Sequence, residues 1–86
     1  MITLTLYSRP DCHLCEIMSR DLALLLRGRA RVEIVDITEN DELEQQYGQR
    51  IPVLAAGADE LSFYRLDTAR VEQFLSNAAP QERRPL

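Results

Sequence analysis

The sequence of this 86-residue chain predicts a single α/β domain. Three observations lead to this class: the N-terminal segment alternates apolar and polar residues, the next segment repeats apolar residues at helical spacing, and turn residues separate short apolar runs later in the chain. A strand-helix-strand unit followed by a short helix, a hairpin and a last helix makes a compact α/β sandwich. We expect the domain to cover residues 1–79 and residues 80–86 to form a flexible tail.

The first strand is expected over Ile2 to Tyr7, where leucines and isoleucine share one face and strand-favouring threonines lie on the other. A helix is expected from about Cys12 to Arg27, and Gly28 supplies its stop. The apolar positions of this helix are Leu14, Cys15, Met18, Leu22, Leu25 and Leu26.

The second strand is expected over Arg31 to Ile37, and apolar residues on both of its sides predict burial on both faces. Thr38 then looks like the N-cap of a short second helix, because acidic residues crowd the following turn, where they complement the helix dipole. Gly48 is expected to end this helix after Tyr47.

Pro52 can only open a strand, so the third strand is expected over Val53 to Ala56. Gly57 to Glu60 has the character of a hairpin turn, and Leu61 to Tyr64 can return antiparallel as the fourth strand. Asp67 is expected to cap the last helix. The buried stripe of this helix consists of Val71, Phe74, Leu75 and Ala78.

Composition and charge exclude several classes of function. Fourteen acidic residues against ten basic ones give a net charge of -4, which repels nucleic acids and anionic lipid surfaces. No apolar run approaches the roughly 20 residues that cross a bilayer, and the N-terminus has no secretory pattern. We therefore expect a cytoplasmic protein, most simply a monomer, without nucleic acid or membrane partners.

The two cysteines, Cys12 and Cys15, directly follow the first strand and open the first helix. A bridge between such close neighbours closes a very short loop and makes a poor structural staple, so its value is chemical. Free backbone N–H groups and the helix dipole favour a thiolate at Cys12, which predicts that Cys12 is the nucleophile. Cys15, one turn further on and facing the core, is then the resolving thiol.

Two charged side chains near this pair leave alternatives open. Arg9, three positions before Cys12, can favour the thiolate or hold an anionic thiol substrate, but it can equally be a solvated loop arginine. His13, the only histidine, can lower the pKa of Cys12 when charged, or its ring can point into solvent.

The cysteines do not complete a metal site within one chain. Structural zinc needs four ligands, whereas Cys12, Cys15 and at best His13 supply three. An iron-sulfur cluster would also need cysteines from outside this chain. We expect no bound metal or cofactor, and a metal or cluster carrier remains an alternative only for a dimer.

The segment from Tyr7 to Cys15 resembles the strand-loop-CxxC segment of glutaredoxins, a branch of the thioredoxin superfamily, and Ile51-Pro52-Val53 resembles the segment that holds the family's cis-proline. The similarity spans about Ile2 to Ala78 and is greatest to short bacterial glutaredoxin-like proteins. It implies a thioredoxin-like βαβαββα fold whose four-stranded mixed sheet has helices on both faces.

The resemblance also implies site residues and partners. Pro52 would be cis and pack beside the cysteines, while the main chain of Ile51 would bind an extended thiol peptide or glutathione. Arg9 would lie near the glycyl carboxylate of glutathione, and Asp67 near its glutamyl amine. A protein or low-molecular-weight disulfide is the implied substrate, with glutathione or a thioredoxin-type reductase system as the reducing partner.

The chain departs from glutaredoxins at two places. His13 and Leu14 replace the common Pro and Tyr, and Tyr64-Arg65 replaces a Gly-Gly pair. The added side chains lie where the glutathione backbone would approach, which argues against tight glutathione binding.

Two hypotheses follow from the residues and the resemblance together. The first is a thiol-disulfide oxidoreductase that works through Cys12 and Cys15. The alternative is a non-catalytic module whose groove around Pro52 and Arg65 holds a thiol compound or a partner peptide.

Overall fold

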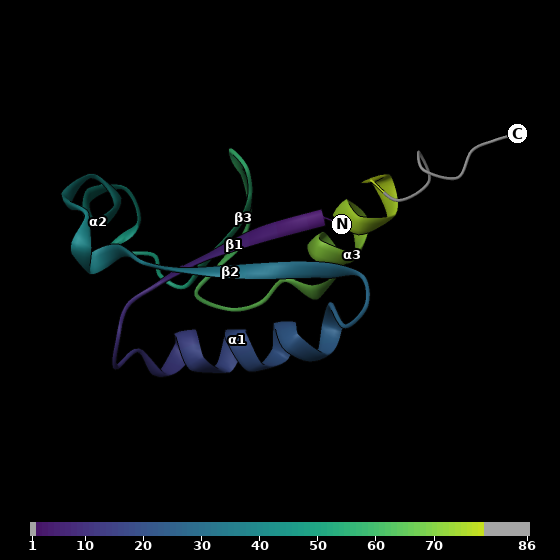
Figure 1. The fold of residues 1–86 in the computed structure, drawn as a ribbon, viewed down its shortest axis with the longest axis horizontal. Helices are drawn as coiled ribbons and strands as arrows, with labels where there is room; N and C mark the ends of the chain where they lie inside the picture. Colours follow the sequence, from purple (N-terminus) through teal and green to yellow (C-terminus); the bar gives the residue numbers. More distant parts are fainter. Residues whose placement is uncertain (1, 79–86) are drawn as a thin grey trace, which may run out of the picture.

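The structure is a computed structural model, and it describes residues 2–78 (Figure 1). Its elements follow the expected βαβαββα order, with one added 3-10 turn, η1. They are β1 (Ile2–Ser8), α1 (His13–Leu25), β2 (Ala30–Asp36), η1 (Ile37–Glu39), α2 (Asp41–Tyr47), β3 (Val53–Ala56), β4 (Asp59–Phe63) and α3 (Thr68–Ala78). The tail expected over residues 80–86 lies outside the described residues.

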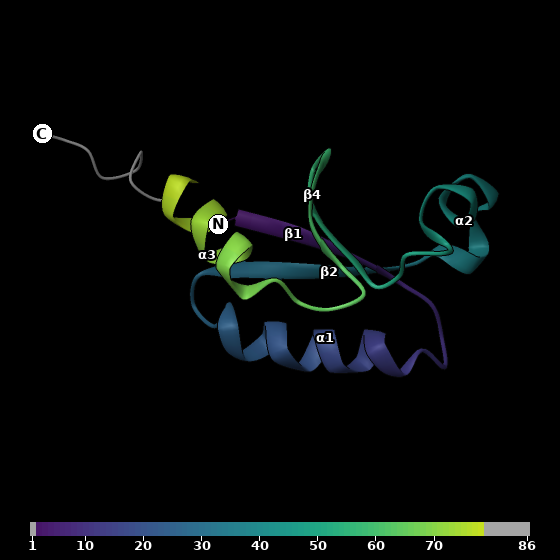
Figure 2. The same cartoon turned by 180° about the vertical axis from the view of Figure 1, so that it is seen from behind.

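The four strands form one mixed sheet in the order β2-β1-β3-β4. β1 runs parallel to β2 and antiparallel to β3, and β3 pairs antiparallel with β4. The parallel pair needs a crossover connection, which α1 supplies as it runs alongside β1 and β2 (Figures 1 and 2). The predicted mixed sheet of four strands is therefore confirmed.

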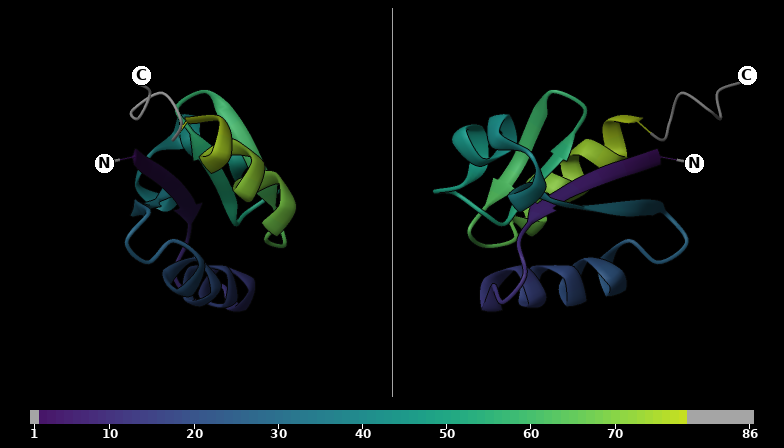
Figure 3. Two further views of the ribbon diagram at one scale, coloured as in Figure 1. Left: turned by 90° about the vertical axis from the view of Figure 1, so that its right-hand side faces the viewer. Right: turned by 60° about the vertical axis from the view of Figure 1, so that its left-hand side comes forward.

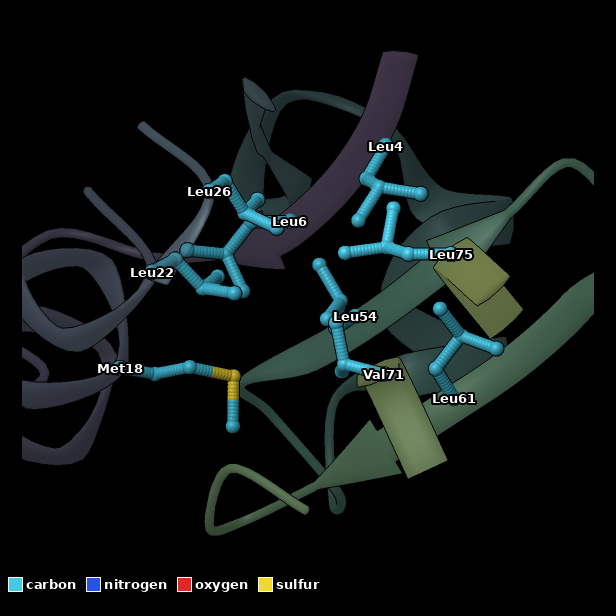
Figure 4. Packing of buried hydrophobic residues seen from close by; sticks show 9 residues of the cluster. All are labelled: Leu4, Leu6, Met18, Leu22, Leu26, Leu54, Leu61, Val71 and Leu75. Atoms are coloured by element: carbon cyan, nitrogen blue, oxygen red, sulfur yellow. The ribbon is translucent and has the colours of Figure 1, made fainter. Parts of the chain in front are cut away.

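The main core lies on the face of the sheet that α1 and α3 cover. Leu4 and Leu6 of β1 and Leu54 of β3 are fully buried on this face (Figure 4). Alternation along the strands sends these side chains to one side of the sheet. The other buried members of this cluster are Met18, Leu22, Leu26, Leu61, Val71 and Leu75.

A second, smaller core lies on the opposite face, beneath α2 (Figure 3). Ile37 and Val53 are fully buried there, and Tyr47 of α2 stacks on Tyr7 of β1 with ring centroids 4.2 Å apart. Burial raises the pKa of the Tyr47 phenol above its usual value, so the ring stays neutral in this stack. Helices thus cover both faces of the sheet, as expected.

The prediction that the second strand is buried on both faces is wrong. β2 occupies an edge of the sheet, and Ile34 at its centre is 58% exposed. Apolar residues on both sides of a strand do not distinguish a central strand from an edge strand that α1 covers only in part.

The cap predicted at Thr38 is also wrong, because Thr38 lies inside η1. Asp36 caps η1 by accepting the Thr38 N–H at 2.9 Å. Asn40 caps α2, since its Oδ1 accepts the N–H groups of Glu42 and Leu43 at 2.9 and 3.1 Å. Because η1 takes up Ile37–Glu39, α2 begins at Asp41 and not directly after Thr38, where the acidic residues led us to expect it.

Asp67 caps α3 as predicted, because its Oδ1 accepts the N–H of Arg70 at 3.0 Å in the first turn. The first helix ends earlier than predicted: α1 stops at Leu25 with Leu26 as its C-cap, and Gly28, with a φ of +73°, lies in the turn that follows. The hairpin turn is tighter than expected, because β4 begins at Asp59 and leaves only Gly57 and Ala58 between the strands.

Arg50 ties the loop between α2 and β3 to β4. Its guanidinium pairs with both carboxylate oxygens of Glu60, at 2.5 and 3.0 Å, and lies 5.7 Å from the ring centre of Tyr47 and 5.9 Å from that of Phe63. The hydrogen bonds from Arg50 hold the pKa of the Glu60 carboxyl below its usual value of 4.5.

Among residues 2–78, the structure contains no helix with the length and apolar character needed to cross a membrane.

We expect Leu54→Ala to lower the free energy of unfolding by about 2 to 5 kcal/mol, because it removes methyl groups at the centre of the main core and leaves a cavity. Leu24→Ala is the matched control, since Leu24 is 69% exposed, and it should cost less than about 0.5 kcal/mol. Urea unfolding measures both values. Equal losses in the two variants would contradict the assigned core.

We expect Glu60→Gln to remove a pH-dependent part of the stability. The pKa of Glu60 is lowered in the folded chain, so its stabilising contribution is present above pH 4.5 and is lost as the pH falls through the lower folded value. The difference in unfolding free energy between wild type and variant should therefore be largest near pH 7 and shrink towards zero in acid.

Urea unfolding at a series of pH values measures this difference. Glu33→Gln, at an exposed position of β2 that has no ion pair among the described residues, is the matched control for the loss of a carboxylate. A pH-independent difference for Glu60→Gln would show that the Arg50 pair does not stabilise the fold.

Candidate active site

Cys12 and Cys15 form a disulfide at the start of α1, with their Cα atoms 5.2 Å apart. Cys12 is the N-cap residue, with extended backbone angles of φ -106° and ψ 107°. Its sulfur accepts the main-chain N–H of Cys15 at 3.1 Å. One of the unpaired N–H groups at the helix start thus points at the sulfur atom that the sequence identifies as the nucleophile.

The two sulfur-bearing residues differ in exposure. Cys12 is half-buried, whereas Cys15 is only 5% exposed and belongs to the core side of α1. This difference is the one that an attacking and a resolving thiol require. The roles themselves stay a prediction.

A short loop, from Arg9 to Asp11, carries the chain from β1 to Cys12. Asp11 has a φ of +61°, a left-handed conformation that aspartate tolerates better than most residues. Pro10 before it cannot extend the strand. The loop therefore turns sharply and places Cys12 at the first turn of α1.

The peptide bond between Ile51 and Pro52 is cis, the geometry that the resemblance to glutaredoxins implies. Tyr7 pairs with Val53 in the antiparallel register. Pro52, which directly precedes Val53, therefore lies at the end of the sheet where β1 leads into the cysteine loop. Pro52 is buried and its carbonyl accepts the N–H of Tyr64 at 3.0 Å. Within residues 2–78, no hydrogen bond engages the main chain of Ile51.

Arg9 turns towards α2. One terminal guanidinium nitrogen, Nη2, lies 2.9 Å from Glu44 Oε1 and donates to the carbonyl of Gly48 at 3.3 Å. A Cβ atom at position 48 would lie 2.8 Å from Glu44 Oε1 and 3.3 Å from the guanidinium, so the glycine leaves room for this pair. Arg9 is thus a partly buried tether to α2 and not a solvated loop arginine, while its anion-binding role stays a prediction.

A cavity of about 420 Å³ lies beside the disulfide. Both cysteines line it, together with Arg9, Arg20 and the exposed Ile34 of β2. The Nε atom of Arg9 is buried and has no hydrogen-bond partner in the part of the chain that the structure describes. Sequence reasoning missed Arg20, because its position in the second turn of α1 carries no motif signal.

The structure separates the remaining predicted site residues. His13 is exposed at the start of α1, and Arg65 lines a groove that also contains Leu14, the residue between His13 and Cys15. Asp67 does not line this groove, and its carboxylate caps α3. The groove therefore unites Arg65 with the CxxC turn but does not include Asp67.

Tyr64, which with Arg65 replaces the Gly-Gly pair of glutaredoxins, lies at the site. Its φ is +64°, and its hydroxyl donates to the carbonyl of Gln49 at 2.6 Å. Tyr64 and Leu14 line the same groove. The glycine that glutaredoxins have at this position is the one signal for the positive φ, since no local pattern of this chain indicates it.

No group of three or more histidine, cysteine, aspartate or glutamate side chains within residues 2–78 is arranged to hold a metal ion.

The comparisons with known proteins agree with this geometry. The family model described as Glutaredoxin-like domain (DUF836) matches residues 3–76. The X-ray structure of target protein XcR50 from X. campestris is 37% identical, with a TM-score of 0.66, and the match covers 87% of this chain and 97% of that one. The solution structure of XcR50 gives the same identity and TM-score and is covered to 94%.

A structure described as that of a malarial protein shares the fold alone, at 14% identity and a TM-score of 0.58, with 90% of this chain and 96% of that chain covered. The comparison with curated proteins finds no match. The match to the family model over most of the chain and the 37% identity to XcR50 show the family. The chain belongs to the glutaredoxin-like domain family and has a thioredoxin-like fold.

Proposed function

We propose that this protein is a thiol-disulfide oxidoreductase that cycles between a Cys12–Cys15 disulfide and the dithiol. The observation that carries the proposal is the arrangement at the start of α1, where the half-buried Cys12 sulfur accepts a helix N–H group and the buried Cys15 lies one turn away. Family membership supports it.

In the reduced protein, the Cys12 thiolate attacks one sulfur of a substrate disulfide. A new sulfur–sulfur bond forms, the substrate bond breaks, and the leaving thiolate takes up a proton. Cys15 then loses its proton and attacks the Cys12 sulfur, which releases the second substrate thiol. The substrate gains two electrons and two protons, and the cysteine pair becomes the disulfide that the structure contains.

The surroundings favour the first attack at Cys12 and the second at Cys15. A thiolate at a helix N-terminus is stabilised by the dipole and by direct N–H donation, which lowers the pKa of its thiol. Burial disfavours the charged form of a thiol, so Cys15, at 5% exposure, stays protonated until the mixed disulfide places a sulfur next to it. Cys12 thus attacks the substrate disulfide, and Cys15 attacks the mixed disulfide that results.

Substrate and reductant belong to the same proposal. The free main-chain groups of Ile51 are suited to pair with an extended thiol peptide, and Arg65 supplies an exposed cation at the neighbouring groove. Return to the dithiol requires two electrons from a thiol reductant, either two glutathione molecules or a thioredoxin-type reductase system. Such a cycle belongs in a reducing compartment such as the cytoplasm.

We expect the cysteine pair to titrate reversibly against a glutathione redox buffer as one two-electron couple, with a potential of about -200 to -270 mV. Cys12→Ser should abolish disulfide reduction. Cys15→Ser should still attack but stop at a mixed disulfide, which mass spectrometry detects as a covalent adduct. The two serine variants are each other's matched control. Each removes one sulfur, and they differ only in whether the attacking or the resolving thiol is lost.

Unchanged disulfide reduction in Cys12→Ser, or the absence of a reversible couple, would sink the proposal. If Cys12→Ser instead kept its affinity for a partner peptide while wild type showed no turnover, a non-catalytic binding module would replace it. A dimer that carries zinc or an iron-sulfur cluster after anaerobic purification would favour a carrier.

A further inference from the structure

Tyr64 adopts a backbone conformation that its residue type disfavours. Its φ is +64°, a left-handed value in which the Cβ atom of an L-residue crowds the following carbonyl. Glycine adopts such angles freely, and Asn and Asp tolerate them. A bulky aromatic residue persists there only where the surrounding structure holds it, which suggests a role for the side chain.

Two hydrogen bonds hold Tyr64 against the loop that contains the cis-proline. Its main-chain N–H donates to the carbonyl of Pro52 at 3.0 Å, and its hydroxyl donates to the carbonyl of Gln49 at 2.6 Å. The two acceptors lie three residues apart, at either end of the segment from Gln49 to Pro52. The ring therefore spans this segment and has little freedom to move away from it.

Tyr64 lines a groove of about 670 Å³ that reaches the CxxC turn at Leu14. Leu14, between His13 and Cys15, is another wall and is 40% exposed, while Tyr64 is 46% exposed. The groove continues along α1 as far as Leu25, about 16 Å from Leu14 at 1.5 Å per residue. Among residues 2–78, the charged residues that line it are Asp21 and Arg65.

We propose that Tyr64 is a specificity-determining residue that selects polypeptide disulfides in which an apolar side chain lies next to the cysteine. This inference rests on the proposed thiol-disulfide exchange. In this proposal the substrate cysteine reacts with Cys12, which lines the smaller cavity, and the side chain beside it packs against Leu14 and Tyr64 in the groove on the other side of the CxxC turn. Burying an apolar group against these two walls lowers the free energy of the bound state, whereas a glycine gains nothing there.

The groove favours an apolar chain over a compact anionic thiol compound. Leu14, Tyr64 and Leu66 present mostly carbon atoms, and the charges of Asp21 and Arg65 are opposite in sign, so the lining has no net attraction for an anion. The fixed position of the ring adds to the selection, because a wall already held by two hydrogen bonds loses little entropy when a substrate binds.

The test uses two peptide disulfides of equal length and charge, with Phe after the cysteine in one and Gly in the other. Stopped-flow mixing with the reduced protein gives the second-order rate constant for each without a reducing partner. We expect wild type to prefer the Phe peptide by about tenfold or more. Tyr64→Gly and Tyr64→Asn, both compatible with the backbone angle, should bring the ratio to within about twofold of one.

Two further variants separate the ring from its surroundings. Tyr64→Phe keeps the ring but loses the hydrogen bond to Gln49, and it should retain a preference intermediate between wild type and Tyr64→Asn. Phe63 is not a neutral control, because its ring centroid lies 5.3 Å from that of Tyr64. Glu33→Ala, at an exposed position of β2 that does not line the groove, is the control and should leave the ratio unchanged.

The outcomes distinguish this inference from the proposed function. Equal rates of wild type with both peptides, or a wild-type ratio retained by Tyr64→Asn, would overturn the specificity role and leave the exchange activity standing. Failure of reduced wild type to exchange with either peptide would overturn the proposed function, and the inference with it. If Tyr64→Gly does not fold, as judged by circular dichroism, Tyr64→Asn and the wild-type ratio still decide.

Discussion

The antiparallel register between β1 and β3 is the constraint on which the rest of the site depends. Because Tyr7 pairs with Val53, the two strands bring the cysteine loop and the cis-proline loop to the same end of the sheet. The alternation of both strands then directs leucines towards α1 and α3, and Tyr7 and Val53 towards α2. A slip of one residue would exchange the two cores and move Pro52 away from the start of α1.

The C-terminal end of α2 joins the two loops of the site. The last carbonyls of a helix lack partners within it and carry partial negative charge. Here Arg9 from the cysteine loop donates to the carbonyl of Gly48, and Tyr64 from the end of β4 donates to the next carbonyl, that of Gln49. Two segments far apart in sequence are thus held by adjacent peptide groups, which makes this short helix a structural support for the site.

This arrangement changes what the basic and aromatic residues contribute. An arginine paired with Glu44 is less available to an anionic substrate than a free one, and Tyr64, held across the cis-proline loop, forms a rigid wall. The proposed chemistry then rests on the sulfur atoms and the main chain near them, while the groove beside them is lined mainly by apolar side chains and by one acidic and one basic residue. In the proposed function, redox chemistry and substrate choice therefore belong to different parts of the site.

The sequence by itself determined the order of elements, the cysteine pair at the start of α1 and the family, because periodicity, caps and the CxxC spacing are local signals. Only the tertiary structure decided that β2 is an edge strand, that Asn40 caps α2, that Arg9 is bound by Glu44 and Gly48, and that Tyr64 has a positive φ. The edge position of β2, the pairing of Arg9 and the φ of Tyr64 depend on partners distant in sequence. The cap at Asn40 depends on a local turn that several residue patterns can form. No pattern along the chain therefore specifies these features.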